Sequence, residues 1–318
     1  MTLKKTKPTL MALAGLAVLF YHLFPWPRGG SLPEVLVRYL LLTAYIGVDI
    51  FFFTAGYMAY FSKTHPYPAY IKRKFSRIYP AFFLFALLAL LMGRLDLGRF
   101  LMALTGMDLF RQGGGAFLWF LPALLLTYLV LPFYKDLVIR RGPGMALALG
   151  WLLWAGLMAF LVLLFGDLAV NIFLCRLPLV FLGTSLASME GRWPANKQLI
   201  LGLVFFLPGL FVTWNWASFS KAVFVVKDSF YLLAIPQTLG LILLLDLIFR
   251  PRQPSFLVKL GGITLELYAL QMVMGPPLLD SLIKGTSNRY LAFLFSSLIL
   301  LALSVLWQAG QKRLTSWK

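Results

Sequence analysis

Charged side chains are scarce in this chain. Only 13% of its 318 residues are Asp, Glu, Lys or Arg, whereas 60% are hydrophobic. A water-soluble domain of this length needs more charge to cover its surface. The mean hydropathy of +0.83 agrees with this, and the composition therefore excludes a soluble globular protein.

Metal-binding and disulfide-forming residues are nearly missing. The chain has 1 cysteine, Cys175, and 2 histidines. One cysteine cannot form an intramolecular disulfide, and so few ligands do not make a structural metal site. Nucleotide motifs are missing too, since the GGG at 113–115 is not followed by GK[ST]. The sequence therefore predicts no metal and no ATP-driven transport.

Acidic residues are few, and the formal net charge is +18 at pH 7. Such a charge can indicate nucleic-acid binding. Here, however, the basic residues lie in short loops between apolar runs, a pattern that is typical of membrane topology and of contacts with anionic headgroups. We therefore expect membrane lipids, and no nucleic acid, as partners.

Apolar runs of about twenty residues recur along the chain, each long enough to cross a ~30 Å hydrocarbon core. They predict an all-α, polytopic membrane helix bundle, forming a single domain over residues 1–318. We expect about ten spans, near 8–26, 35–61, 77–93, 116–134, 144–165, 169–189, 198–214, 229–249, 256–279 and 290–310. Two connecting segments, 94–115 and 215–228, favour interfacial or re-entrant helices.

Loop charges predict the orientation of the bundle. With a cytoplasmic N-terminus, basic residues are about twice as frequent in the inner segments as in the outer ones, as the positive-inside rule requires. Both chain ends are then cytoplasmic. The first apolar run lacks a small-x-small cleavage site, so we expect a retained helix rather than a signal peptide.

Two titratable residues near or within the first two runs are candidates for function, because an ionisable group in hydrocarbon is expensive. His22 ends the first run, and it either reaches water at the interface or acts as a general base. Asp49 lies inside the second run. It either pairs with Arg38 or Arg176, caps a neighbouring helix, or orients a catalytic histidine or a substrate hydroxyl.

Later runs contain two more isolated charges. Arg176 lies in NIFLCRLPLVFLG, and it needs a partner, for which Asp49, Glu266 and a bound anion are the alternatives. Glu266 is a single carboxylate in LGGITLELYALQ. Trp119 either stacks on a sugar ring or belongs to the aromatic belt at the membrane interface.

The densest basic cluster is YIKRKFSRIYP at 70–80. Lys74 and Arg77 are three residues apart and therefore share one face if this segment is helical. Together with Arg73 they either set the topology or bind phosphate groups at the inner membrane surface.

Five segments carry a family resemblance, and they occur in the order LAGLAVLFYHLF, GVDIFFFTAGY, IKRKFSRIYP, WFLPALLLTYLVLP and LGGITLELYALQ. Together they resemble the integral-membrane acyltransferase family 3, which acylates sugars and cell-surface polysaccharides. The resemblance extends over most of the chain. It implies a ten-helix bundle, and we expect a location in a bacterial cytoplasmic membrane.

The resemblance implies transfer of an acyl group, most simply acetyl, from acyl-CoA to a hydroxyl of a glycan or a lipid-linked sugar. The catalytic histidine falls on His22 and the signature carboxylate on Asp49. The paired basic residues fall on Lys74 and Arg77, which with Arg73 are expected to bind the phosphates of CoA. The candidates for substrate binding are Arg176, Glu266 and Trp119.

Three positions depart from the family pattern. Met11 stands where the family usually has an arginine, Ala55 where it has a serine, and Gln271 where it often has a histidine. The chain therefore resembles a divergent member. The alternative is a non-catalytic or translocating component of polysaccharide synthesis or export, and polysaccharide biosynthesis proteins are expected partners in either case.

Overall fold

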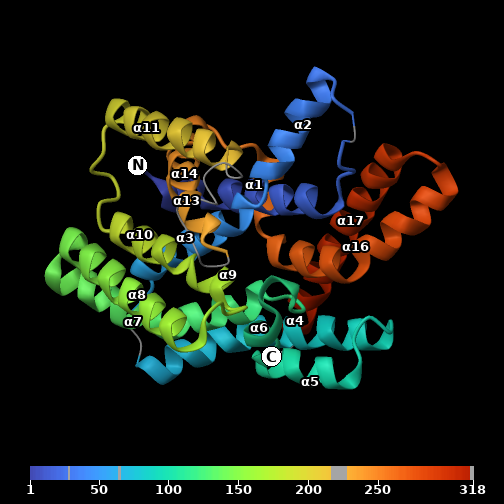
Figure 1. The fold of residues 1–318 in the computed structure, drawn as a ribbon, viewed down its shortest axis with the longest axis horizontal. Coiled ribbons are helices and arrows are strands. Elements are labelled where there is room, and N and C mark those ends of the chain that lie inside the picture. Colours follow the sequence, from blue (N-terminus) through green and yellow to red (C-terminus); the bar gives the residue numbers. More distant parts are fainter. Residues whose placement is uncertain (28, 64–65, 216–227, 316–318) are drawn as a thin grey trace.

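A computed structural model describes residues 1–318 apart from 28, 64–65, 216–227 and 316–318. The described residues form helices and connecting loops, with no strand among them (Figure 1). The all-α architecture expected from the apolar runs is thus confirmed.

Seven helical stretches are long and apolar enough to cross a membrane. Five of them are the continuous helices α4 (Tyr67–Leu91), α7 (Phe120–Arg141), α8 (Pro143–Phe165), α11 (Ala195–Trp214) and α17 (Arg289–Thr315). The other two are interrupted: α2 (Leu32–Thr43) continues into α3 (Ile46–Tyr60), and α13 (Phe230–Leu233) into α14 (Ile235–Phe249). Interruptions of this kind leave the overall direction of a span intact.

An eighth stretch consists of α15 (Ser255–Gly261) and α16 (Thr264–Thr286), which are bent by 67° relative to each other. The described residues therefore contain seven candidate spans, or eight with this bent pair, where the sequence predicts about ten. The remaining two expected spans are helical, but they do not meet the same criteria of length and apolar composition. They are α1 (Leu3–Leu23), whose apolar stretch is bounded by Lys7 and His22, and the interrupted pair α9 (Asn171–Leu174) and α10 (Leu177–Ala187).

The connecting segment 94–115 contains two short helices, α5 (Leu97–Thr105) and α6 (Met107–Gln112), and a 3-10 turn, η1 (Gly113–Gly115). Leu97, Leu101 and Phe110 are exposed there, as expected for helices that rest in a membrane interface. Most of the second such segment, 216–227, lies outside the described residues.

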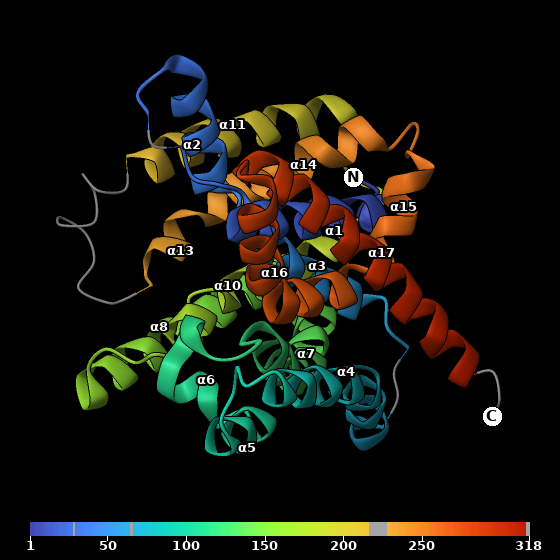
Figure 2. The ribbon, with the colours of Figure 1, turned by 90° about the vertical axis from the view of Figure 1, so that its right-hand side faces the viewer.

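The central helix is α3, which is buried along most of its length and packs against α1, α7, α10 and α14. Glycines permit these close crossings. A Cβ atom at Gly56 would lie 2.1 Å from the Val180 carbonyl oxygen of α10, and one at Gly183 of α10 would lie 2.2 Å from the Phe53 carbonyl oxygen of α3. Figures 1 and 2 show α8 and α11 at the periphery, where apolar side chains such as Leu163 are exposed.

The start of α1 and the end of α17 lie on the same side of the bundle, toward the right in Figure 2. Lys7 in α1 and Gln311 in α17 line one common cavity. We call this the inner side; from the loop charges we predict that it is cytoplasmic.

Candidate active site

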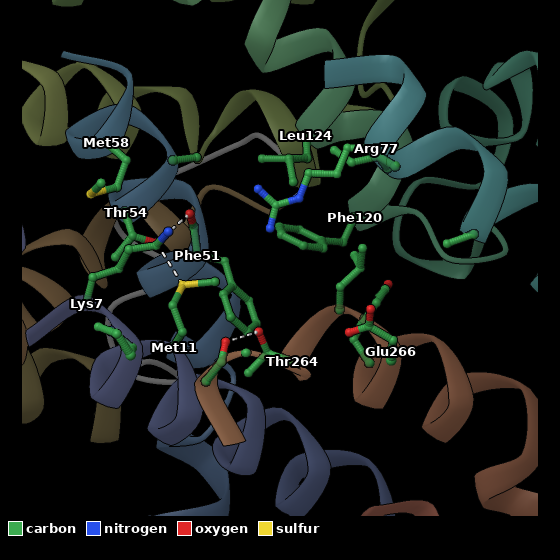
Figure 3. Close-up of a pocket in the computed structure, with 18 of the residues that line it drawn as sticks. Lys7, Met11, Phe51, Thr54, Met58, Arg77, Phe120, Leu124, Thr264 and Glu266 are labelled. Carbon is green, nitrogen blue, oxygen red and sulfur yellow. Dashed lines mark hydrogen bonds between the residues drawn. The ribbon is translucent and has the colours of Figure 1, made fainter. Parts of the chain in front are cut away.

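The cavity, of about 450 Å³, is lined by residues of α1, α3, α4, α7, the bent α15–α16 pair and the end of α17. We call it the inner cavity. The lining side chains labelled in Figure 3 are Lys7, Met11, Phe51, Thr54, Met58, Arg77, Phe120, Leu124, Thr264 and Glu266. Charged and apolar side chains thus line one cavity.

Three cations line the inner cavity: Lys7 from α1, and Lys74 and Arg77 from α4. The Nζ atom of Lys74 lies 4.3 Å from the ring centroid of Tyr128 and 5.4 Å from that of Tyr70, so cation–π contacts hold it in place. Burial, and then the positive charge of Arg77, lower the pKa of Lys7. A bound anion relieves this repulsion, so the arrangement favours a ligand with several negative charges.

Aromatic rings form the opposite part of the inner cavity. The ring centroid of Phe120 lies 5.5 Å from that of Phe51 and 5.5 Å from that of Tyr268. Phe51 and Phe120 are the outermost lining residues of α3 and α7. The cavity therefore has a charged inner part and an apolar outer part, which suits a ligand with a charged end and a neutral arm.

The bend between α15 and α16 forms another wall. Gly261 and Gly262 line the inner cavity at this bend, together with Thr264 and Glu266 of the first turn of α16. A Cβ atom at Gly261 would lie 1.9 Å from the Pro8 carbonyl oxygen, so glycine allows α15 to approach α1. The bend also brings the N-terminus of α16, with its free backbone N–H groups, to the cavity.

Of the residues expected to bind CoA, Lys74 and Arg77 line the inner cavity, and the expected substrate residue Glu266 lines it too. Arg73 is exposed on α4 and lies outside the lining. Sequence reasoning missed Lys7, which was assigned to topology alone. The sequence contained a signal for this role of Lys7. Lys7 is four residues before Met11, which stands at the arginine position of the family pattern, and the two residues share one helical face.

Two of the departures from the family pattern fall on the wall of the inner cavity. Met11 and Ala55 both line it, and the Thr54 hydroxyl donates to Met11 Sδ at 3.3 Å. An arginine and a serine at these positions would make the wall more polar. The third departure, Gln271, is buried in α16 outside the lining.

Asp49 and Arg176 form a buried ion pair nearer the outer side. Arg176 Nε donates to Asp49 Oδ1 at 2.6 Å, and Arg176 Nη1 donates to the Ile172 carbonyl oxygen at 2.6 Å. The guanidinium carbon lies 3.4 Å from the ring centroid of Tyr231 and 5.3 Å from that of Trp119. The structure therefore brings Asp49, Arg176 and Trp119 together, apart from the inner cavity.

This pairing answers one question that the sequence leaves open, because Asp49 is the partner of Arg176 rather than Glu266. The role of Asp49 in orienting an imidazole or a hydroxyl stays a prediction, as do the roles of Arg176 and Trp119 in substrate binding. Tyr231 was not anticipated, since nothing in its local sequence distinguishes it from other interfacial tyrosines.

His22 lies in the last turn of α1, is exposed, and contacts Tyr21 with ring centroids 5.3 Å apart. It is ~16 Å further along the helix axis than Met11, at the usual rise of about 1.5 Å per residue. His22 is not among the residues that line the inner cavity, and the structure therefore separates it from that cavity. Among the described residues, no group of three or more potential metal ligands occurs.

The sequence was also compared with known protein families and proteins. Residues 10–309 match a family described as an acyltransferase domain, that of acyltransferase family 3. The comparisons with curated proteins and with solved structures give no match. Because the matched range contains all five resembling segments and nearly the whole bundle, the chain is a membrane acyltransferase that belongs to the acyltransferase 3 family.

Proposed function

We propose that this enzyme takes its acyl group from acyl-CoA, acetyl-CoA in the simplest case, and transfers it to a hydroxyl of a glycan or a lipid-linked sugar. The observation that carries the proposal is the inner cavity, in which Lys7, Lys74 and Arg77 stand beside an apolar wall. CoA has phosphate groups at one end and a long neutral arm at the other. The cations bind the phosphates, and the apolar wall holds the arm.

His22 is the proposed general base. A neutral imidazole takes the proton of the acceptor hydroxyl while the hydroxyl oxygen attacks the thioester carbonyl carbon. The new C–O bond forms, the C–S bond breaks, and CoA leaves as a thiolate that then takes up a proton. The exposed position of His22 at the outer end of α1 supports entry of the acceptor from the outer side.

This scheme requires the thioester arm to extend outward along α1 from the inner cavity. The distance to cover is ~16 Å from the level of Met11 to that of His22. The residues that bind the acyl donor are therefore separate from the residue that activates the acceptor. Variants of the first set should change KM for the donor, and variants of His22 should change turnover.

The test is turnover of acetyl-CoA by the purified protein in lipid nanodiscs with a panel of glycan acceptors, followed by release of the CoA thiol. Lys74→Ala and Arg77→Ala are each expected to raise KM for acetyl-CoA about tenfold or more, since each removes a charge-assisted contact. His22→Ala is expected to abolish turnover and to keep acetyl-CoA binding.

Lys72→Ala is the matched control, because Lys72 is exposed on α4 and lies outside the lining. It removes the same charge and should leave KM unchanged. Wild-type turnover by His22→Ala would refute the proposed base. If the wild-type protein did not bind radiolabelled acetyl-CoA, the non-catalytic or translocating alternative would replace the proposal.

A further inference from the structure

A second cavity, of about 70 Å³, lies beside the inner end of α3. It has room for one compact polar group rather than for a nucleotide. The lining residues come from the end of α3 and the chain after it, from α4 and from α7. Those used below are Lys63, Tyr70, Lys135 and Asp136. We call it the headgroup cavity. It shares no lining residue with the inner cavity.

Three hydrogen-bond donors make the headgroup cavity suitable for an anion. Lys135 is only 9% exposed, and its Nζ donates to the Ser62 carbonyl oxygen at 2.6 Å, which uses one of the three donors of an ammonium group. Tyr70 is 4% exposed, and its hydroxyl has no hydrogen-bond partner among the residues that the structure describes. A buried hydroxyl in that state is unfavourable, so a ligand that accepts its hydrogen bond is favoured. Lys63 is exposed at the side of the cavity.

The position of the headgroup cavity identifies the source of the anion. On α7, Val130 and Phe133 expose 44% and 64% of their surfaces, and Lys135 and Asp136 follow directly on the inner side. Tyr67, at the start of α4, packs on Phe133 with ring centroids 5.1 Å apart, as aromatic residues do at the membrane interface. A lipid whose chains lie along this apolar face of α7 therefore places its phosphate at the level of Lys135.

We propose that the headgroup cavity binds the phosphodiester group of an anionic phospholipid from the inner leaflet. Lys63 and Lys135 pair with the phosphate oxygens, and the Tyr70 hydroxyl donates to one of them. Asp136 also lines the cavity, so two lysines and one aspartate give the lining a single net positive charge. An anionic phospholipid neutralises that charge, whereas a zwitterionic one does not. This site does not depend on the proposed reaction.

The test is retention of added lipid by the full-length protein in detergent, measured by native mass spectrometry. Phosphatidylglycerol is expected to be retained at least about threefold more strongly than phosphatidylcholine. Tyr70→Phe removes only the hydroxyl that lacks a partner, and Lys63→Ala removes an exposed charge, so both variants should fold. Each is expected to weaken retention of phosphatidylglycerol about fivefold.

Lys72→Ala serves as the control here too, and it should retain phosphatidylglycerol like the wild type. Equal losses in Lys72→Ala and Lys63→Ala would indicate general attraction to an anionic surface and overturn the site. Unchanged retention in the double variant Tyr70→Phe/Lys63→Ala would overturn it as well. Complete displacement of the lipid by millimolar inorganic phosphate would make soluble phosphate the ligand and overturn the lipid assignment.

Discussion

At the scale of single residues, two proposed roles fall on the Lys7 side chain. Its charge contributes to the positive inner segment at the start of α1, and its side chain lines the inner cavity with Lys74 and Arg77. Met11, one turn further on, has no charge to contribute. Lys7 is thus the α1 residue that supplies a cation to the proposed donor site.

We predict that Lys7→Ala raises KM for acetyl-CoA about tenfold and leaves kcat less affected, because a charge-assisted contact to phosphate is lost. Steady-state kinetics of the purified protein measure both constants. Lys4→Ala is the control, since Lys4 is exposed and lies outside the inner cavity. An equal rise in KM for the two variants would show that only the overall charge matters.

We predict that the same residue makes binding of the proposed acyl donor depend on pH. Lysine is charged below its pKa, and the pKa of Lys7 is lowered by burial and by Arg77. The contribution of Lys7 is therefore present at low pH and is lost as pH rises, at a lower pH than for an ordinary lysine of pKa about 10.4. Lys7→Ala should remove this part of the pH dependence of KM.

The sequence alone identifies the charged residues in the apolar runs, but it does not identify the residues that they contact. Asp49 and Arg176 are recognisable because each is a single charge in an apolar run, and their pairing was one of several alternatives. The contact of Tyr231 with Arg176 depends on how α13 meets α9 and α10, which no local pattern contains. The separation of His22 from the inner cavity likewise becomes visible only with α1 in place.

At the scale of helices, the crossing of α3 and α10 depends on glycines that face the opposite backbone. Gly56 and Gly183 leave no room for a Cβ atom, as their distances to the Val180 and Phe53 carbonyl oxygens show. The Asp49–Arg176 pair joins α3 to the residue just before α10. Close approach of these two helices is therefore needed for the buried ion pair.

We predict that Gly183→Ala lowers the free energy of unfolding by about 1–3 kcal/mol, because the added methyl group forces α3 and α10 apart. Thermal unfolding in detergent, followed by circular dichroism, measures the change. Gly156→Ala in α8 is the matched control, since a Cβ atom there meets nothing within 4 Å. Alanine favours a helix more than glycine does, so Gly156→Ala should not lower the stability. A similar loss of stability in both variants would show that the crossing of α3 and α10 is not responsible.

The helices follow from apolar runs, but their interruptions were not predicted. Composition alone makes 35–61, 169–189 and 256–279 look continuous. Local signals existed in two of them, because Pro178 occupies the first turn of α10 and Gly261 and Gly262 lie at the bend before α16. A hydropathy value averaged over about twenty residues changes little when one or two of them are proline or glycine, so it does not detect such interruptions.

At the scale of the whole molecule, the shared cavity of Lys7 and Gln311 places the start of α1 and the end of α17 on one side. Loop charge predicts which side this is, since it places the N-terminus, the basic loop after α3 and the C-terminus in the cytoplasm. Cys175 is buried, so cysteines introduced elsewhere can report the orientation.

We predict that a cysteine in place of Arg192 is labelled by a membrane-impermeant maleimide only after the cells are permeabilised. A cysteine in place of Gly285 should be labelled in intact cells, because Gly285 lies in the last turn of α16 and the long helix α17 returns from there to Gln311 at the inner cavity. Both positions are exposed. The reverse pattern would invert the orientation, and labelling of both in intact cells would contradict the common side of the chain ends.

We predict that the bend between α15 and α16 makes the insulating layer of the membrane thinner at this enzyme. Backbone that leaves the helix at membrane depth is tolerated where protein covers it or water reaches it, and Gly261 and Gly262 border a cavity with three cations. We expect water to enter the inner cavity along its charged lining. The electrical potential of the inner side then extends outward as far as the level of Phe51 and Phe120. The membrane potential, about 2.3 kcal/mol per unit charge and 100 mV, then falls mainly across the remaining outer layer. In the proposed reaction, an acyl group delivered along α1 then has to cross only that layer rather than the full ~30 Å of hydrocarbon.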